Sequence, residues 1–140
     1  MISTETKIRV RYADTDQMKM VYHSKYLEYF EQGRSDLLRS IGLPYPKIES
    51  MGYYLPVIEA HAKFLIAGRY DDLLIVRTML AETPKVRVSL EYAIIREKTQ
   101  ELLVVGYTVH GFVDAARGKP TRPPSEFLDM VNKAFGTVKQ

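Results

Sequence analysis

Two aspartates, a lysine and a histidine stand close together near the start of this 140-residue sequence. The stretch that holds them, DTDQMKMVYHSKY, covers residues 14–26, with carboxylates at Asp14 and Asp16 and an imidazole at His23. A carboxylate can act as a nucleophile or as a general base. If this segment is extended, Asp14 and Asp16 point to the same side and repel each other, which favours a functional use. Turn chemistry is the alternative, because Asp and Thr after a strand often bond to the backbone.

The elements on either side of this stretch decide what its side chains can reach. Residues 7–12, KIRVRY, alternate apolar and polar side chains and predict a half-buried strand. Residues 25–42 carry an apolar stripe with helical spacing, with Ser24 as a candidate N-cap and Gly42 as a candidate stop. The first N–H groups of that helix lack intrahelical partners, and together with the helix dipole they can stabilise an oxyanion. A carboxylate beside such a site suits acyl transfer or hydrolysis.

Four more strand-like segments follow, separated by turn signals that predict antiparallel pairing of consecutive strands. The segments cover residues 53–66, 72–83, 86–97 and 101–115, and a short helix is expected over residues 123–135. This order predicts a single α+β domain over residues 1–140, with a long helix packed on one face of an antiparallel sheet. The other sheet face is left partly apolar, which favours a homo-oligomer.

The composition limits the chemistry. The absence of cysteine excludes disulfides, a thiolate nucleophile and Cys-based zinc sites. The histidines His23, His61 and His110 are too far apart for a metal motif, and no phosphate-binding or dinucleotide-binding glycine pattern is present, so we expect no metal or cofactor. No apolar run approaches the roughly 20 residues of a membrane helix, and a cytoplasmic protein is expected. The net charge of +3 comes from scattered residues, which does not indicate nucleic-acid binding.

Three segments resemble a known family. They are RVRYADTDQMKMVYHSKYLEYFEQGR, GRYDDLLIVRTML and GYTVHGFVDAARGKPTRPP, which together cover much of residues 9–124. They are similar to the 4-hydroxybenzoyl-CoA thioesterase-like hot-dog family of the YbgC/FcbC type. The resemblance implies a long central helix wrapped by a five-stranded antiparallel sheet, and acyl-CoA thioesterase activity without a cofactor. It also implies a homodimer or homotetramer with active sites at subunit interfaces.

The resemblance assigns roles within residues 14–26. Asp16 matches the catalytic carboxylate, and His23 matches the residue whose backbone N–H polarises the thioester carbonyl. Tyr22 and Tyr26 are expected to line the substrate pocket. The family usually has glycine where this chain has Lys19, so either the loop takes an ordinary conformation here or Lys19 projects into or across the acyl pocket.

Other cations are expected to bind the phosphate groups of CoA, since Lys and Arg pair well with phosphate. The candidates are Lys85, Arg87, Lys119 and Arg122, with ordinary surface charge as the alternative. Glu31 on the long helix is the alternative catalytic carboxylate. A non-catalytic acyl-CoA-binding domain, favoured by Lys19, also stays open. A hot-dog dehydratase fits less well, because it needs a His–carboxylate arrangement. The acyl group and the choice between nucleophile and general base are open as well.

Overall fold

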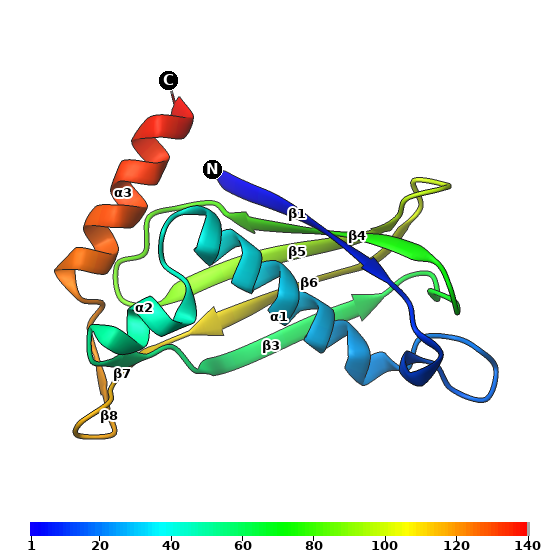
Figure 1. The fold of residues 1–140 in the computed structure, drawn as a ribbon, viewed down its shortest axis with the longest axis horizontal. Helices are drawn as coiled ribbons and strands as arrows, with labels where there is room; N and C mark the ends of the chain where they lie inside the picture. The colour runs from blue at the N-terminus through cyan, green and yellow to red at the C-terminus, as the bar shows by residue number, and fades with distance from the viewer. Residues whose placement is uncertain (140) are drawn as a thin grey trace.

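A computed structural model describes residues 1–139, and Figure 1 shows its fold. The N-terminal part contains β1 (Ile2–Arg9), a short 3-10 helix (Tyr12–Asp14), α1 (His23–Ser40) and α2 (Tyr45–Ser50). The strands that follow are β2 (Tyr53–Tyr54), β3 (Val57–Phe64), β4 (Leu73–Leu80), β5 (Val88–Arg96), β6 (Leu102–His110), β7 (Phe112–Asp114) and β8 (Lys119–Thr121). The last described element is α3 (Ser125–Lys139).

Five strands form one antiparallel sheet in the order β1-β4-β5-β6-β3. The long helix α1 lies along one face of this sheet (Figure 1). On β4, for example, Leu74, Val76, Thr78 and Leu80 are buried, whereas the alternate residues are half-buried on the other face. This period of two is what a strand covered on one face requires. The predicted α+β hot-dog architecture is therefore confirmed.

Small residues opposite large ones let α1 approach the sheet closely. Phe30 of α1 stacks on Tyr92 of β5, with ring centroids 4.3 Å apart. Gly106 of β6 makes room for the Phe30 ring, because a Cβ at Gly106 would lie 2.7 Å from Phe30 Cε2 and would also meet the carbonyl oxygen of His61. A larger residue at Gly106 would therefore displace α1 from the sheet.

The residues predicted to begin and to end α1 agree with the structure at only one of the two ends. The stop at Gly42 is confirmed, since Gly42 has a φ of +80° and its N–H donates to the carbonyl oxygen of Arg39. The predicted N-cap, Ser24, is wrong. The helix begins at His23, and Tyr22 is the N-cap.

Short-range details of the prediction also change. The connection after α1 contains a short helix, α2, which has Pro44 as its N-cap and a second proline in its first turn. Residues 53–66 form two strands rather than one, and residues 101–115 turn at Gly111 between β6 and β7. The first strand starts earlier than expected and ends at Arg9, because a 3-10 turn follows it.

The path from β3 to β4 is the largest difference from the expected topology. β3 is an edge strand paired with β6, whereas β4 lies between β1 and β5. These consecutive strands are therefore not neighbours. Residues 65–72 carry the chain past the ends of β6 and β5 to reach β4, and we call this segment the strap.

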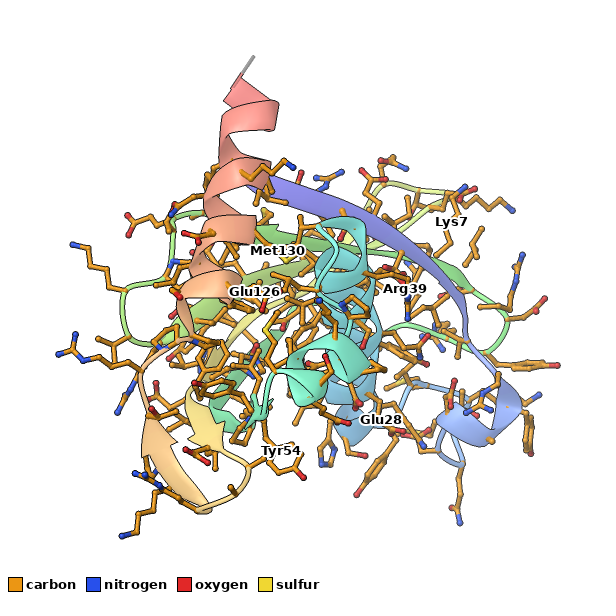
Figure 2. All side chains as sticks on the ribbon, turned by 60° about the vertical axis from the view of Figure 1, so that its left-hand side comes forward. Lys7, Glu28, Arg39, Tyr54, Glu126 and Met130 are labelled. Atoms are coloured by element: carbon orange, nitrogen blue, oxygen red, sulfur yellow. The ribbon has the colours of Figure 1, made fainter. Side chains whose placement is uncertain are left out.

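The helices α2 and α3 pack away from the start of α1. Glu126, labelled in Figure 2, stands at the start of α3, and its Oε1 lies 3.4 Å from Nζ of Lys47 on α2. Met130, one turn further along, packs against the core near the C-terminal end of α1 (Figure 2). Among residues 1–139, no helix has the length and apolar character needed to cross a membrane.

Candidate active site

A surface pocket of about 310 Å³ opens beside the first turn of α1. Asp16, Tyr22, His23 and Tyr26 line one side of it. Residues 64–67, at the end of β3 and the start of the strap, form the opposite wall. Four residues selected from the sequence, two as catalytic and two as substrate-binding, thus lie in one pocket.

Asp16 stands at the base of a tight hairpin formed by residues 16–20. Its N–H donates to the carbonyl oxygen of Met20 at 2.9 Å, and its carbonyl oxygen accepts the N–H of Lys19 at 3.0 Å. The carboxylate oxygen Oδ1 accepts the N–H groups of Met18 at 2.8 Å and Met20 at 3.2 Å. Within residues 1–139 the other oxygen, Oδ2, has no hydrogen-bond partner. That oxygen is available to a substrate or a water molecule.

Lys19 adopts a left-handed backbone conformation, with a φ of +63°. The expectation of an ordinary loop conformation is therefore wrong, since Lys19 follows the path that glycine adopts easily. A non-glycine residue in this conformation carries about 1 kcal/mol or more of strain. The side chain of Lys19 is exposed and is not among the pocket-lining residues, so its contact with substrate stays a prediction.

The first turn of α1 presents unpaired backbone donors next to this hairpin. No side chain caps the helix, whose N-cap is Tyr22. The N–H of Lys25 donates to the carbonyl oxygen of Tyr22 at 2.9 Å, whereas the N–H groups of His23 and Ser24 have no acceptor in the described part of the chain. Two free donors at the positive end of a helix dipole are suited to hold an oxyanion.

Asp14 has quite different surroundings, because it belongs to the 3-10 helix that ends just before the hairpin of Asp16. It is 2% exposed, and it accepts the backbone N–H and the guanidinium of Arg11 at 3.2 and 3.0 Å and the hydroxyl of Tyr29 at 2.9 Å. Burial raises the pKa of Asp14, but these hydrogen bonds and the charge of Arg11 outweigh it and hold the pKa below its usual value. Its carbonyl oxygen also accepts the N–H of Tyr22, so Asp14 fixes the N-cap of α1.

Aromatic rings form much of the pocket wall. Tyr26 is buried, and its phenolic oxygen accepts the N–H of Gly68 at 3.0 Å. Burial raises the pKa of Tyr26, and its ring lies 5.5 Å from that of Phe64. Tyr22 is exposed, with its ring 4.3 Å from the His23 ring. Such a wall suits an apolar or aromatic acyl group.

The cations predicted to bind CoA lie at the other end of the sheet (Figure 1). Lys85 and Arg87 belong to the β4–β5 connection, where they line a separate hollow of about 550 Å³. Lys119 and Arg122 lie in and just after β8. The eight residues of β4, which run between the two ends, span about 26 Å. Within one chain these cations are therefore remote from Asp16, and their role in binding CoA stays a prediction.

The remaining candidates lie outside the pocket. Glu31 is exposed on α1 and lines a different surface hollow. His110 is fully buried with its Nε2 2.8 Å from Thr108 Oγ1, and burial lowers the pKa of His110 to about 4. His61 is exposed on β3 and stacks on Tyr107. Among residues 1–139, no three or more His, Asp or Glu side chains form a group that could hold a metal ion.

The strap side of the pocket was not anticipated from the sequence, where residues 53–66 predict a single strand. One signal could have found it. Phe64, Leu65 and Ile66 are three consecutive apolar residues that break the alternation of a strand, and a glycine follows at position 68. All three side chains are exposed in the structure, as expected for a wall open to a ligand or to a second chain.

Comparisons with known proteins identify the family of the chain. Residues 10–131 match the model of the thioesterase-like superfamily. The acyl-CoA thioesterase YbgC of Haemophilus influenzae is 31% identical over 134 residues, covering 94% of this chain and 93% of that protein. A putative acyl-CoA thioesterase, YneP, of Bacillus subtilis is 30% identical over 126 residues, covering 90% of this chain and 91% of that protein. A crystal structure of a DHNA-CoA thioesterase from Staphylococcus aureus has a TM-score of 0.87 at 30% identity, covering 99% of this chain and 92% of that one.

The chain belongs to the thioesterase-like superfamily, and its fold is the hot-dog fold. The resemblance noted in the sequence is thereby confirmed. So is the expected enzyme class, a thioester hydrolase.

Proposed function

We propose that the chain hydrolyses acyl-CoA thioesters to a free acid and CoA, with Asp16 as the catalytic carboxylate. One observation carries the proposal: the unpartnered Oδ2 of Asp16 and the unpaired N–H of His23 belong to residues that line the same pocket. A thioester bound between them has its carbonyl oxygen at the positive end of α1 and its carbonyl carbon beside a carboxylate. The names of relatives that span nearly the whole chain support the same substrate class.

Two routes are compatible with this geometry. In the first, Oδ2 of Asp16 attacks the carbonyl carbon, the C–S bond breaks, CoA leaves as a thiolate that takes up a proton, and water hydrolyses the resulting anhydride. In the second, Asp16 removes a proton from a water molecule, which attacks the carbon directly as the thiolate leaves. In both routes the N–H of His23 stabilises the oxyanion that develops on the carbonyl oxygen.

The pocket wall supports aromatic and short or medium aliphatic acyl groups. Tyr22, Tyr26 and Phe64 offer ring surface. The DHNA-CoA thioesterase structure makes an aromatic thioester a sensible first substrate. Because the proposed substrate is a CoA thioester, the cytoplasm remains the expected compartment.

A second copy of the chain is expected to complete the site. β3 is an edge strand, so one side of its backbone is unpaired, and it ends in the pocket wall at Phe64. Val57 and Ile58 at its start and Leu65 and Ile66 just after its end are exposed. An unpaired edge with exposed apolar residues is a template for pairing with another chain.

Such pairing would also account for the distant cations. When two β3 edges pair antiparallel about a two-fold axis, the start of β3 in one copy meets the end of β3 in the other. The end of the second copy that carries Lys85, Arg87, Lys119 and Arg122 then lies on the same side as the first copy's pocket. Cations remote from Asp16 within one chain can in this way serve the nucleotide of a CoA bound in the dimer.

The competing proposal is an acyl-CoA-binding domain without turnover, which Lys19 would favour if it blocked the pocket. The structure weakens that argument. Lys19 takes the backbone conformation that a glycine would take, and its side chain is not among those that line the pocket. The free oxygen of Asp16 also has no evident use in a domain that only binds.

The first test is thiol release from acetyl-, hexanoyl- and benzoyl-CoA by the wild type and by Asp16→Asn. We expect hydrolysis of at least one thioester by the wild type. The variant should lose about 10²- to 10⁴-fold in kcat, because it lacks the carboxylate that acts on the carbonyl carbon or on water. Asp129→Asn, an exposed change on α3, is the matched control and should retain wild-type turnover.

Near-normal turnover by Asp16→Asn would remove Asp16 from the chemistry. If no thioester is hydrolysed but benzoyl-CoA binds in a calorimetric titration, the domain without turnover is the better description.

A further inference from the structure

The strap does more than form a wall of the pocket, since it also fastens the hairpin that carries Asp16. The N–H of Val21 donates to the carbonyl oxygen of Gly68 at 2.8 Å, and the N–H of Tyr70 donates to the carbonyl oxygen of Lys19 at 3.0 Å. Between these two bonds, Met20 and Arg69 form an isolated antiparallel bridge. Residues 19–21 are thus bound to residues 68–70 as a short two-stranded ladder.

The sheet and its flanking residues hold the strap in turn. Arg9 of β1 donates to the carbonyl oxygen of Asp71 at 2.8 Å, and Leu103 and Val10 form backbone hydrogen bonds with the two ends of the strap.

A further side chain, Arg96 at the end of β5, contacts the strap at two points. Its Nε donates to Asp72 Oδ2 at 2.9 Å, and its Nη2 donates to the carbonyl oxygen of Ala67 at 2.9 Å. Its Nη1 donates to Glu101 Oε1 at 2.7 Å, and the Arg96 side chain is 14% exposed. The Asp72 oxygen also accepts the N–H of Arg69 at 2.9 Å. The guanidinium of Arg96 therefore forms hydrogen bonds with the strap near both of its ends, at Ala67 and at Asp72.

We propose that Arg96 is a positioning residue for the reaction, acting through the strap to set the place of Asp16 relative to the start of α1. The inference rests on the function proposed above for Asp16. It adds a residue that touches neither substrate nor reacting atoms and that lies on a different element from the hairpin and from α1.

The physical reason is that the hairpin's own hydrogen bonds fix only its internal shape. The bonds of Asp16 to Met18, Lys19 and Met20 stay intact if the hairpin moves as a unit. The strap, the Asp14–Tyr22 bond and the bonds from Thr15 to the carbonyl oxygen of Tyr12 tie it to the rest of the molecule. A displacement of about 1 Å at a reacting group can reduce the rate about 100-fold. Lysine cannot substitute fully at position 96, because a single ammonium does not reproduce the planar fork that spans these acceptors.

The kinetic test compares Arg96→Met and Arg96→Lys with Arg77→Met as a matched control. Arg77 lies on β4 and pairs with Glu5 of β1, remote from the strap. We expect Arg96→Met to lower kcat for the best CoA thioester by about 10- to 100-fold at saturating substrate. Arg96→Lys should recover part of that loss, and Arg77→Met should retain the wild-type kcat. An Arg96→Met protein with a lowered melting temperature but an unchanged kcat would overturn the proposal.

Amide hydrogen exchange tests the same inference without any substrate. In Arg96→Met, the amides of Val21 and Tyr70 should exchange faster by a larger factor than the amides of the β4–β5 ladder, because only the strap and hairpin are released. A uniform loss of protection, or none, would contradict it. If the wild type cleaves no thioester, the function proposed for Asp16 fails, while exchange still decides whether Arg96 holds the hairpin. Should Arg96→Met not fold, Asp72→Ala removes the acceptor shared by Arg96 and Arg69 and takes its place in both measurements.

Discussion

Lys19 stands where the backbone needs a positive φ. The hot-dog family that the sequence resembles usually has glycine at this position. Its carbonyl oxygen is used by Tyr70 of the strap and its N–H by Asp16, so the surrounding hydrogen bonds hold Lys19 in this conformation. An L-residue with a side chain is strained there, and glycine is not. The hairpin therefore keeps its shape at some expense in stability.

Lys19→Gly is expected to stabilise the fold by up to about 1 kcal/mol. The strain energy that is relieved in the folded state exceeds the entropic cost of ordering a glycine, which is more flexible in the unfolded chain. Urea denaturation gives the free energy of unfolding. Gln17→Gly is the control, since Gln17 lies in the same hairpin without a positive φ. It should destabilise the protein by about 0.5–1 kcal/mol. Equal destabilisation by both changes would show that Lys19 carries no strain.

The two aspartates show what residue types alone could predict. The DTD spacing indicated a functional carboxylate, and the structure places Asp16 in the pocket with one oxygen unpartnered. The assumption of an extended segment failed, because Asp14 bonds to the backbone N–H of Arg11 in a 3-10 turn. Turn chemistry applies to both aspartates, since Oδ1 of Asp16 also accepts backbone N–H groups of its hairpin. Turn chemistry and a candidate catalytic role, treated as alternatives in the sequence, are therefore combined in Asp16.

At the scale of elements, α1, β5 and β6 share a buried polar network that the catalytic proposal does not use. Arg34 Nη1 donates to the hydroxyl of Tyr92 at 3.2 Å, and that hydroxyl lies 2.6 Å from Thr108 Oγ1. Thr108 Oγ1 is in turn 2.8 Å from His110 Nε2. Burial and the nearby charge of Arg34 lower the pKa of His110 to about 4 from its ordinary 6.5, so the folded protein holds this ring neutral.

This network predicts a loss of stability in mild acid. Between pH 6.5 and about 4 the unfolded chain binds a proton at position 110 and the folded chain does not, so the free energy of unfolding falls as the pH is lowered. Above pH 6.5 the neutral His110 causes no loss in the free energy of unfolding. As the pH falls, the loss grows and reaches about 3 kcal/mol near pH 4. Urea denaturation across this range should show a shallower slope in His110→Asn than in the wild type. His61→Asn, at an exposed histidine, is the control and should keep the wild-type slope. If His110→Asn also keeps the wild-type slope, groups other than His110 cause the pH dependence of stability.

Periodicity could predict the elements but not their neighbours. The helical stripe of α1 and the alternation in β4, β5 and β6 come from burial on one face, which a single sequence displays. The six-residue helix α2 is too short to show a period. The separation of β3 from β4 depends on β6 pairing with both β5 and β3, a choice made by tertiary packing. For this reason the side of the pocket formed by residues 16–26 was predictable, and the side formed by Phe64 and the strap was not.

At the scale of the whole molecule, the unpaired edge of β3 sets the expected assembly. A dimer built there joins two five-stranded sheets and covers the exposed apolar residues at both ends of the strand. It also brings a second copy's cationic end towards each pocket. Activity and assembly should therefore be lost together.

Ile58→Lys tests this expectation. Ile58 is 49% exposed on β3 and lies at the end away from the pocket, so an added charge should oppose edge pairing without altering the hairpin of the same chain. Light scattering after size exclusion should show a monomer, and kcat/KM for CoA thioesters should fall at least tenfold, because each pocket loses the cations of its partner. Tyr54→Lys, at a similarly exposed residue of β2 (Figure 2), should remain dimeric and active. A monomeric Ile58→Lys protein with full activity would show that one chain holds the complete site.

The strap joins residues of the N-terminal crossing to a side chain on β5, which lies more than seventy positions later in the sequence. Contacts of such long range form late in folding, since the loop that separates them must first be closed. A growing or partly folded chain therefore contains Asp16 and the start of α1 before Arg96 has formed its hydrogen bonds with the strap. If Asp16 and Arg96 act as proposed, cleavage of thioesters begins only when the chain is folded through β5, and unfinished molecules leave activated acyl groups intact.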